Sequence, residues 1–188
     1  MKGVLINASR GAVVETSALN SLLQSGRLRA CALDVWEHEP AIDVELLNLA
    51  TLGTPHIAGY SYDGKLKATE MLEQSLATFF QMPYTPTDFA EKGELKEIAL
   101  PEPPILLDAL VREAVAQCYS VVRDDADLRR IVSYPTNERP AYFRNLRATY
   151  KTRREFSRYI VNVSGFGEET RRTFAALGFK INDLRDAA

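Results

Sequence analysis

The sequence predicts an α/β chain: half of a doubly wound parallel sheet, followed by a small α+β domain. Three observations lead to this class. Short apolar runs alternate with helical patterns through residues 3–54, the order that is typical of parallel α/β structure. The runs at 3–7 and 30–35 are nearly continuous, as expected for strands that are covered on both faces. The composition then changes near Pro83, where prolines and polar residues interrupt the pattern.

The elements of the first part follow from local signals. Residues 3–7 predict a strand that leads into an Asn-Ala-Ser-Arg-Gly turn. Thr16 or Ser17 can cap a helix that reaches Leu23, and Gly26 suits the position just past its end. The remaining elements expected here are a strand over 30–35, a short helix over 43–49, a strand over 52–54 and a helix over 65–82.

The second part has a weaker pattern, and we expect a small sheet with helices. We divide the chain into residues 1–83, a linker over 84–93 and a domain over 94–188. The elements expected in the last of these are strands over 95–100, 159–163 and 179–182, and helices over 105–118, 124–132, 138–157 and 168–177.

The composition excludes several classes of protein. Of the 188 residues, 46% are hydrophobic and 26% are charged, and the net charge is −2, which disfavours nucleic-acid binding. No apolar run approaches the roughly 20 residues that a membrane span needs. Cys31 and Cys118 cannot form a disulfide framework, and His38 has no further His or Cys at metal-ligand spacing. We therefore expect a cytoplasmic protein without a metal site.

Candidate catalytic side chains follow three predicted strands. Arg10 follows the first strand, Asp34 ends the second and His56 follows the third. The carboxyl ends of parallel strands meet at one edge of the sheet, where ligands bind. A histidine can exchange the proton of a hydroxyl, a carboxylate can orient it, and an arginine can bind a substrate carboxylate. Glu37 and Glu39 are both candidates for the orienting carboxylate.

Three motifs resemble, in order and spacing, the signatures of the NAD-dependent D-2-hydroxyacid dehydrogenases. They lie at residues 5–15, 32–40 and 54–61, and they contain Asn-Ala-Ser-Arg-Gly, Asp-Val-Trp-Glu-His-Glu-Pro and Thr-Pro-His-Ile-Ala-Gly. The resemblance implies that Arg10 binds the substrate carboxylate and that His56 is the acid/base. It also implies that Glu39, the residue before a proline, is the partner of the histidine, with Glu37 as the competitor.

The same resemblance implies NAD as cofactor and the second half of its binding domain as the fold of residues 1–83. Asp34 would contact the nicotinamide end, and the rest of that pocket would be formed by Ala8, Ser9, Arg10, Gly59 and Tyr60. The glycine-rich turn that cradles the pyrophosphate in this family has no counterpart after Met1. We therefore expect the chain to be truncated at its N-terminus and inactive alone.

The tail resembles the C-terminal dimerisation domain of one branch of this family, whose substrate is a small phosphorylated 2-hydroxy acid. The segments that carry this resemblance are 121–129, 150–157 and 177–179. It implies a homodimer formed through the second domain. Seven basic residues lie in 139–158, and a solvated helix face is one interpretation of them. The other is that Arg153 or Arg154 contacts the substrate phosphate of the partner protomer, with an ion pair inside the domain as the alternative.

Two other functions remain open from the sequence. The chain could belong to another D-2-hydroxyacid dehydrogenase, for example one that acts on glycerate or phosphoglycerate, or it could be a non-enzymatic dimerisation or regulatory module. The retained arginine, glutamate and histidine argue against the non-enzymatic class. A second glycine-rich turn, Gly165-Phe-Gly167, imitates a dinucleotide fingerprint, but the helix after it opens with Glu168 and Glu169, which would repel a pyrophosphate.

Overall fold

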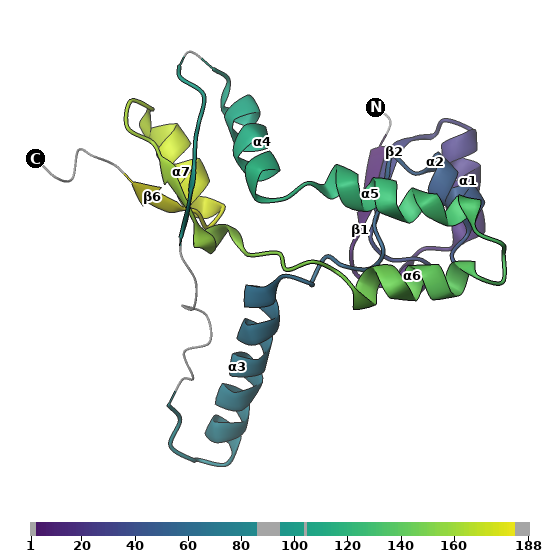
Figure 1. The fold of residues 1–188 in the computed structure, drawn as a ribbon, viewed down its shortest axis with the longest axis horizontal. Helices are drawn as coiled ribbons and strands as arrows, with labels where there is room; N and C mark the ends of the chain where they lie inside the picture. Colours follow the sequence, from purple (N-terminus) through teal and green to yellow (C-terminus); the bar gives the residue numbers. More distant parts are fainter. Residues whose placement is uncertain (1–2, 86–94, 104, 183–188) are drawn as a thin grey trace, which may run out of the picture. The chain divides into compact units, whose positions relative to one another are not determined.

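A computed structural model describes residues 3–85, 95–103 and 105–182. The chain forms two compact units, which we describe separately. Unit 1 combines residues 3–59 with 121–151, and unit 2 combines 60–120 with 152–182, within the described ranges. Each unit contains one three-stranded parallel sheet with helices, so the α/β class expected from the sequence is confirmed. Figure 1 shows these elements along the chain.

Unit 1 is built around the parallel strands β1 (Gly3–Asn7), β2 (Leu28–Leu33) and β3 (Leu52–Gly53), in that order across the sheet. Its helices are α1 (Thr16–Gln24), α2 (Val44–Leu49), α5 (Val121–Arg129) and α6 (Arg139–Ala148). Local chemistry accounts for the ends of these helices. Asp43 caps α2 by accepting a 2.6 Å hydrogen bond from the Leu46 N–H, and Gly26 has the positive φ of 64° that favours glycine after a helix.

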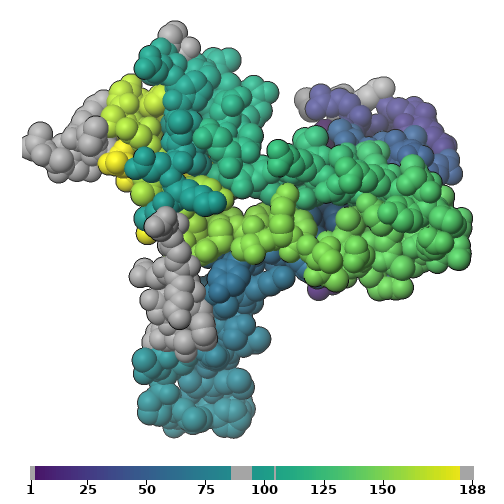
Figure 2. All heavy atoms as spheres, in the orientation of Figure 1, coloured from purple at the N-terminus to yellow at the C-terminus, as the bar shows by residue number. Residues whose placement is uncertain are grey.

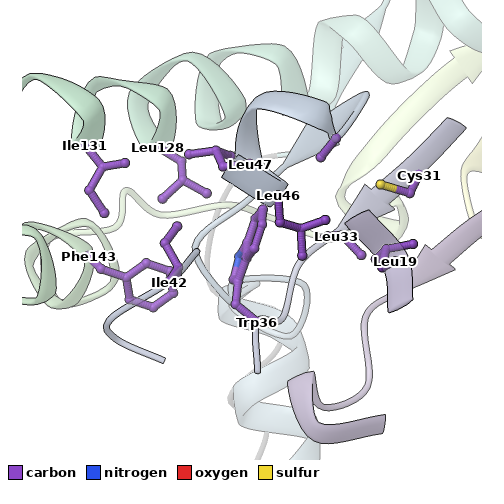
Figure 3. Close-up of a cluster of buried hydrophobic side chains, with 11 residues drawn as sticks. Leu19, Cys31, Leu33, Trp36, Ile42, Leu46, Leu47, Leu128, Ile131 and Phe143 are labelled. Carbon is purple, nitrogen blue, oxygen red and sulfur yellow. The ribbon is translucent and has the colours of Figure 1, made fainter. Parts of the chain in front are cut away.

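The core of unit 1 joins two distant parts of the sequence. Leu128, Ile131 and Phe143, all fully buried, pack into one cluster with Trp36 and Leu47. Figure 3 shows this cluster, with Leu128 and Phe143 turned toward the side chains of the first part of the chain. Helices α5 and α6 lie side by side on the face of unit 1 seen in Figure 2. The segment 121–151 therefore completes the hydrophobic core of the first 59 residues.

Unit 2 contains the parallel strands β4 (Lys96–Ile98), β5 (Tyr159–Asn162) and β6 (Lys180–Asn182), with β5 in the centre. Its helices are α3 (Tyr62–Phe79), α4 (Leu107–Cys118) and α7 (Glu168–Ala176). Val161 and Phe174 are fully buried in its core. Large apolar side chains of α3 and its C-cap are exposed among the described residues: Met71, Leu72, Leu76, Phe79 and the capping Phe80. No described helix is long and apolar enough to cross a membrane.

The units do not follow the sequence division at 84–93, because α5 and α6 pack with the first 59 residues. Most of the expected linker lies outside the described residues. The division of the protein into domains at that point stays a prediction. The helix expected over 138–157 ends at Ala148, since the backbone of Arg153 pairs with that of Ser61 and the Tyr62 N–H donates to the Arg153 carbonyl at 2.8 Å.

Candidate functional site

The turn after β1 presents Arg10 at the carboxyl edge of the sheet in unit 1. Asn7 is buried and shapes the turn: its Oδ1 accepts from the N–H and the Oγ–H of Ser9, and its Nδ2 donates to the Arg10 carbonyl. Gly11 is required here, because an added Cβ would lie 1.9 Å from the Trp36 carbonyl oxygen. The Arg10 side chain is exposed, and its Nη1 donates to the Ser9 carbonyl at 2.6 Å.

Asp34 holds the loop that carries His56. The Asp34 carboxylate is buried and accepts three hydrogen bonds, from Thr54 Oγ1 at 2.6 Å, the Ile57 N–H at 2.8 Å and the Ala58 N–H at 2.9 Å. The Asp34 N–H in turn donates to the Asn7 carbonyl at 2.9 Å. The ends of all three strands are therefore connected through this one residue.

His56 and Glu39 form the central pair of the site. His56 Nδ1 lies 2.7 Å from Glu39 Oε2, and the two side chains are 30% and 19% exposed. An ionised carboxylate can only accept, so the neutral ring carries its proton on Nδ1 and leaves Nε2 as an acceptor. The other Glu39 oxygen accepts from the Trp36 N–H at 2.8 Å, which fixes the carboxylate. Trp36 is buried and donates its indole N–H to the Thr54 carbonyl at 3.0 Å.

Glu37, the competing carboxylate, has a different partner. Its Oε2 accepts from the Thr16 N–H at 2.8 Å, at the start of α1. This hydrogen bond lowers the pKa of Glu37 below its ordinary value. His38 is 73% exposed at its side chain and lies 4.0 Å from Glu37. Of the two carboxylates that the sequence left open, Glu39 is the one that reaches His56.

The remaining predicted site residues lie on the turn after β1, at the end of the His56 loop or outside unit 1. Ala8 and Ser9 are exposed beside Arg10, and Gly59 is exposed at the end of the His56 loop. Tyr60 begins unit 2, where the Lys65 ammonium lies 3.9 Å from its ring centroid. Among the described residues, no group of three or more acidic, His or Cys side chains could hold a metal ion.

The basic residues proposed for the phosphate have defined contacts in unit 2. Arg154 forms a two-pronged ion pair with the buried Asp63, with its Nε 2.9 Å from Oδ2 and its Nη2 2.7 Å from Oδ1. The guanidinium of Arg153 lies 4.7 Å from the centroid of the Tyr119 ring. This ion pair favours the interpretation of Arg154 as part of an ion pair inside the domain. A contact of Arg153 or Arg154 with the substrate phosphate stays a prediction.

Sequence reasoning missed three residues that build the site. Asn7 and Thr54 lie inside the quoted motifs, so their position at strand ends could have pointed to them. Arg147 of α6 donates from Nε to the His56 carbonyl at 3.3 Å, and 91 residues separate the two. No local pattern predicts a contact over that separation.

This edge of the sheet offers an imidazole with an acceptor nitrogen, a carboxylate that fixes it, and an exposed guanidinium on the turn after β1. An imidazole of this kind can take a proton from a hydroxyl, and a guanidinium can bind a carboxylate.

Comparisons with known families agree with the motifs. Residues 1–58 match the model of the D-isomer specific 2-hydroxyacid dehydrogenase NAD binding domain, and residues 89–178 match a domain of unknown function, DUF3410. The resemblance to this family is thereby confirmed.

Nearly the whole chain is similar to proteins named erythronate-4-phosphate dehydrogenase. It is 38% identical to the one from Marinobacter nauticus, over 95% of this chain and 47% of that protein. It is 39% identical to the one from Cellvibrio japonicus, over 94% of this chain and 48% of that protein. The chain therefore spans about half the length of the curated relatives it matches.

Proposed function

We propose that this chain, which is similar along nearly its whole length to the erythronate-4-phosphate dehydrogenases, carries the acid/base half of an NAD-dependent dehydrogenase. The substrate would be 4-phospho-D-erythronate, which is oxidised at C2 to the 2-oxo acid. The observation that carries the proposal is the 2.7 Å contact between His56 Nδ1 and Glu39 Oε2 at the sheet edge. The similarity to the named relatives supports the substrate, and it would place the reaction in pyridoxal 5′-phosphate biosynthesis.

The chain's own residues would act as follows. His56 Nε2 takes the proton of the C2 hydroxyl, since Nδ1 is engaged by Glu39. Glu39 keeps the ring oriented and stabilises the imidazolium that results. Arg10 binds the substrate carboxylate and stabilises charge on the developing carbonyl oxygen. Of these three side chains, that of Arg10 is exposed, as a group that meets substrate must be.

The described residues fit one end of NAD. Ala8, Ser9 and Arg10 are exposed at the end of β1, next to the end of β2, and the end of β3 lies beyond β2. In parallel α/β sheets a nucleotide binds at this edge. Asp34 also lies at this edge, and its carboxylate accepts three hydrogen bonds, from Thr54 and from the N–H groups of Ile57 and Ala58. NAD supplies the hydride acceptor when bound, and these residues would hold its nicotinamide end.

The proposal extends to assembly and location. We propose a homodimer formed through the second part of the chain, as the resemblance of the tail implies, in the cytoplasm. Light scattering of the 188-residue chain at tens of micromolar tests the dimer. A mass that corresponds to two chains is expected, and a monomer would contradict it.

The function is tested with a fusion enzyme, in which the part of the Marinobacter nauticus relative that this chain does not match precedes the chain. We expect the fusion enzyme to form NADH from NAD and 4-phospho-D-erythronate at an ordinary enzymatic rate, about 1–1000 per second. The chain alone should show no appreciable turnover. D-glycerate and 3-phospho-D-glycerate serve as competing substrates. A clear preference for either would favour another dehydrogenase of this family, and a fusion enzyme inactive on all three would favour the non-enzymatic module.

A further inference from the structure

His56 has an unusual backbone conformation. Its φ is +57°, in the left-handed region that non-glycine residues rarely occupy. A residue in this region relaxes to negative φ unless its surroundings hold it. The direction of the imidazole follows from the backbone, so the conformation of this one residue decides whether the ring meets Glu39.

The peptide groups around His56 are held from two sides. On one side, the Asp34 carboxylate accepts from the N–H groups of Ile57 and Ala58. On the other, Arg147 donates from Nε to the His56 carbonyl itself at 3.3 Å. The first contact comes from the nucleotide-binding motifs. The second comes from α6, in the region whose family-model match is a domain of unknown function.

The helices next to the loop are firmly attached to the first part of unit 1. Arg129 donates to the carbonyls of Leu47 and Ala50, both at 2.8 Å. The Gly53 N–H donates to Asp125 Oδ1 at 2.7 Å, and Asp125 also pairs with Arg129. Phe143, four residues before Arg147, is fully buried in the shared core. Because its helix is fixed in this way, Arg147 can act on the loop as a rigid support.

We infer that Arg147 is a positioning residue for the acid/base histidine. Its hydrogen bond to the His56 carbonyl holds the left-handed conformation, which turns Nδ1 toward Glu39 and leaves Nε2 for the substrate. The segment 121–151 is thus part of the active-site architecture as well as of the core. The catalytic meaning of this role rests on the proposed function, whereas the positioning itself does not.

The tautomer of the His56 ring shows whether Arg147 positions the histidine, and it can be measured without enzymatic activity. The chain has two histidines, so His38→Gln leaves His56 as the single ring signal in a ¹⁵N NMR spectrum. In this background the neutral ring should carry its proton on Nδ1, as the contact with Glu39 requires. Arg147→Met should shift the ring toward the Nε2–H form that free imidazole favours in water. Arg147→Lys, which keeps a donor, should shift it less.

Arg144→Met is the matched control, because Arg144 is an exposed arginine on the same helix. It should leave the tautomer unchanged. A folded Arg147→Met chain with the wild-type tautomer would overturn the inference. If Arg147→Met fails to fold, the hydrogen bond can be measured by NMR in the chain that keeps Arg147. We expect a scalar coupling between Arg147 Nε and the His56 carbonyl carbon, and its absence would overturn the inference.

The fusion enzyme separates this inference from the proposed function. In it, Arg147→Met should lower kcat by up to about 100-fold through misplacement of the base, with KM for NAD unchanged. Arg144→Met should not change kcat. A tautomer shift in the chain combined with an inactive fusion enzyme would refute the proposed function and keep the positioning. An active fusion enzyme combined with an unchanged tautomer in Arg147→Met would support the proposed function and refute the positioning role of Arg147.

Discussion

The two units carry the same small sheet with different carboxyl edges. Both sheets have three parallel strands. In unit 1 the strand ends present Asn7, Asp34 and Thr54, which are buried. Asn7 is hydrogen-bonded to the Arg10 turn, Asp34 to the His56 loop, and Thr54 to Asp34. In unit 2 the corresponding ends present Asn162 and Asn182, which are exposed.

The difference lies in what the polar side chains at the described strand ends hold in place. In unit 1 the buried side chains of Asn7 and Asp34 form hydrogen bonds with the backbone of two loops. These loops carry Arg10 and His56. In unit 2 the Asn162 side chain accepts only a local hydrogen bond from the Ser164 N–H, at 2.9 Å, among the described contacts. The glycine-rich turn after β5 has no heavy atom within 4 Å of a Cβ added at Gly165 or Gly167.

The largest expected effect is on catalysis. In the fusion enzyme, His56→Ala should lower kcat/KM by about 100–10,000-fold, the usual contribution of a general acid or base. His38→Ala is the control, because its side chain is exposed and lies beside Glu37. Steady-state kinetics of both variants measure this. Equal losses would mean that the wrong imidazole has been assigned.

The next effect is on the stability of unit 2. Asp63→Ala leaves the Arg154 guanidinium, 21% exposed, without its carboxylate, and should lower the free energy of unfolding by about 3–5 kcal/mol. Glu70→Ala removes an exposed ion pair with Lys67 and should cost less than about 1 kcal/mol. Urea denaturation of the chain compares the two. Similar losses would show that the Asp63 pair is no stronger than a surface pair.

The same pair predicts a pH dependence. Burial raises the pKa of Asp63, but the hydrogen bonds from Arg154 and the Glu155 N–H outweigh it and hold the pKa below its ordinary value. The resulting stability is present above the ordinary carboxyl pKa and is lost as the pH falls through the folded-state pKa. Urea midpoints measured from neutral to acidic pH should therefore fall more steeply in the wild type than in Asp63→Asn. Parallel curves would contradict this.

A pair of glycines sharpens the comparison of the two edges. Gly11→Ala places a methyl group against the Trp36 carbonyl and should lower the free energy of unfolding by about 1–3 kcal/mol, as overpacking does. At Gly167, which has a φ of −75°, an added Cβ meets no atom within 4 Å beyond its chain neighbours. Because Gly167 is the N-cap of α7, Gly167→Ala should cost about 0.5–1 kcal/mol through the weaker cap alone. Thermal unfolding measures both. A neutral Gly11→Ala would show that the turn tolerates displacement.

The smallest expected effect concerns the phosphate. In the fusion enzyme, Arg153→Met should raise KM for 4-phospho-D-erythronate and spare a non-phosphorylated 2-hydroxy acid, if this arginine reaches the partner's site. Arg154→Met should also reduce stability, because Arg154 pairs with Asp63. If KM for the two substrates changes equally in both variants, or in neither, then neither arginine binds the phosphate.

The sequence predicted the first part of the fold well because its strands are continuous apolar runs. The predicted ends of helices were wrong where contacts with distant residues or capping side chains determine them. The helix α3 begins at Tyr62 rather than residue 65, since Ser61 caps it and accepts from the Gly64 N–H at 3.1 Å. The sequence also placed the cap of α1 at Thr16 or Ser17, whereas Glu15 occupies that position and Glu37 accepts from the Thr16 N–H.

The site was only partly predictable for the same reason. Arg10, Glu39 and His56 lie in motifs with recognisable spacing, and the structure brings Glu39 to His56. The segment 121–151 gave no sign that it would pack on the first 59 residues, because its contacts there are 72–91 residues away in sequence.

The most direct test of the central claim is a kinetic comparison of Glu39→Gln with Glu37→Gln in the fusion enzyme. The account predicts that Glu39→Gln lowers kcat/KM by about 100-fold or more, because it removes the carboxylate that orients the ring of His56. Glu37→Gln should leave kcat/KM close to the wild-type value, since Glu37 accepts from the Thr16 N–H instead. An unchanged kcat/KM for Glu39→Gln, or a loss caused by Glu37→Gln alone, would contradict the assignment of this pair as the catalytic acid/base.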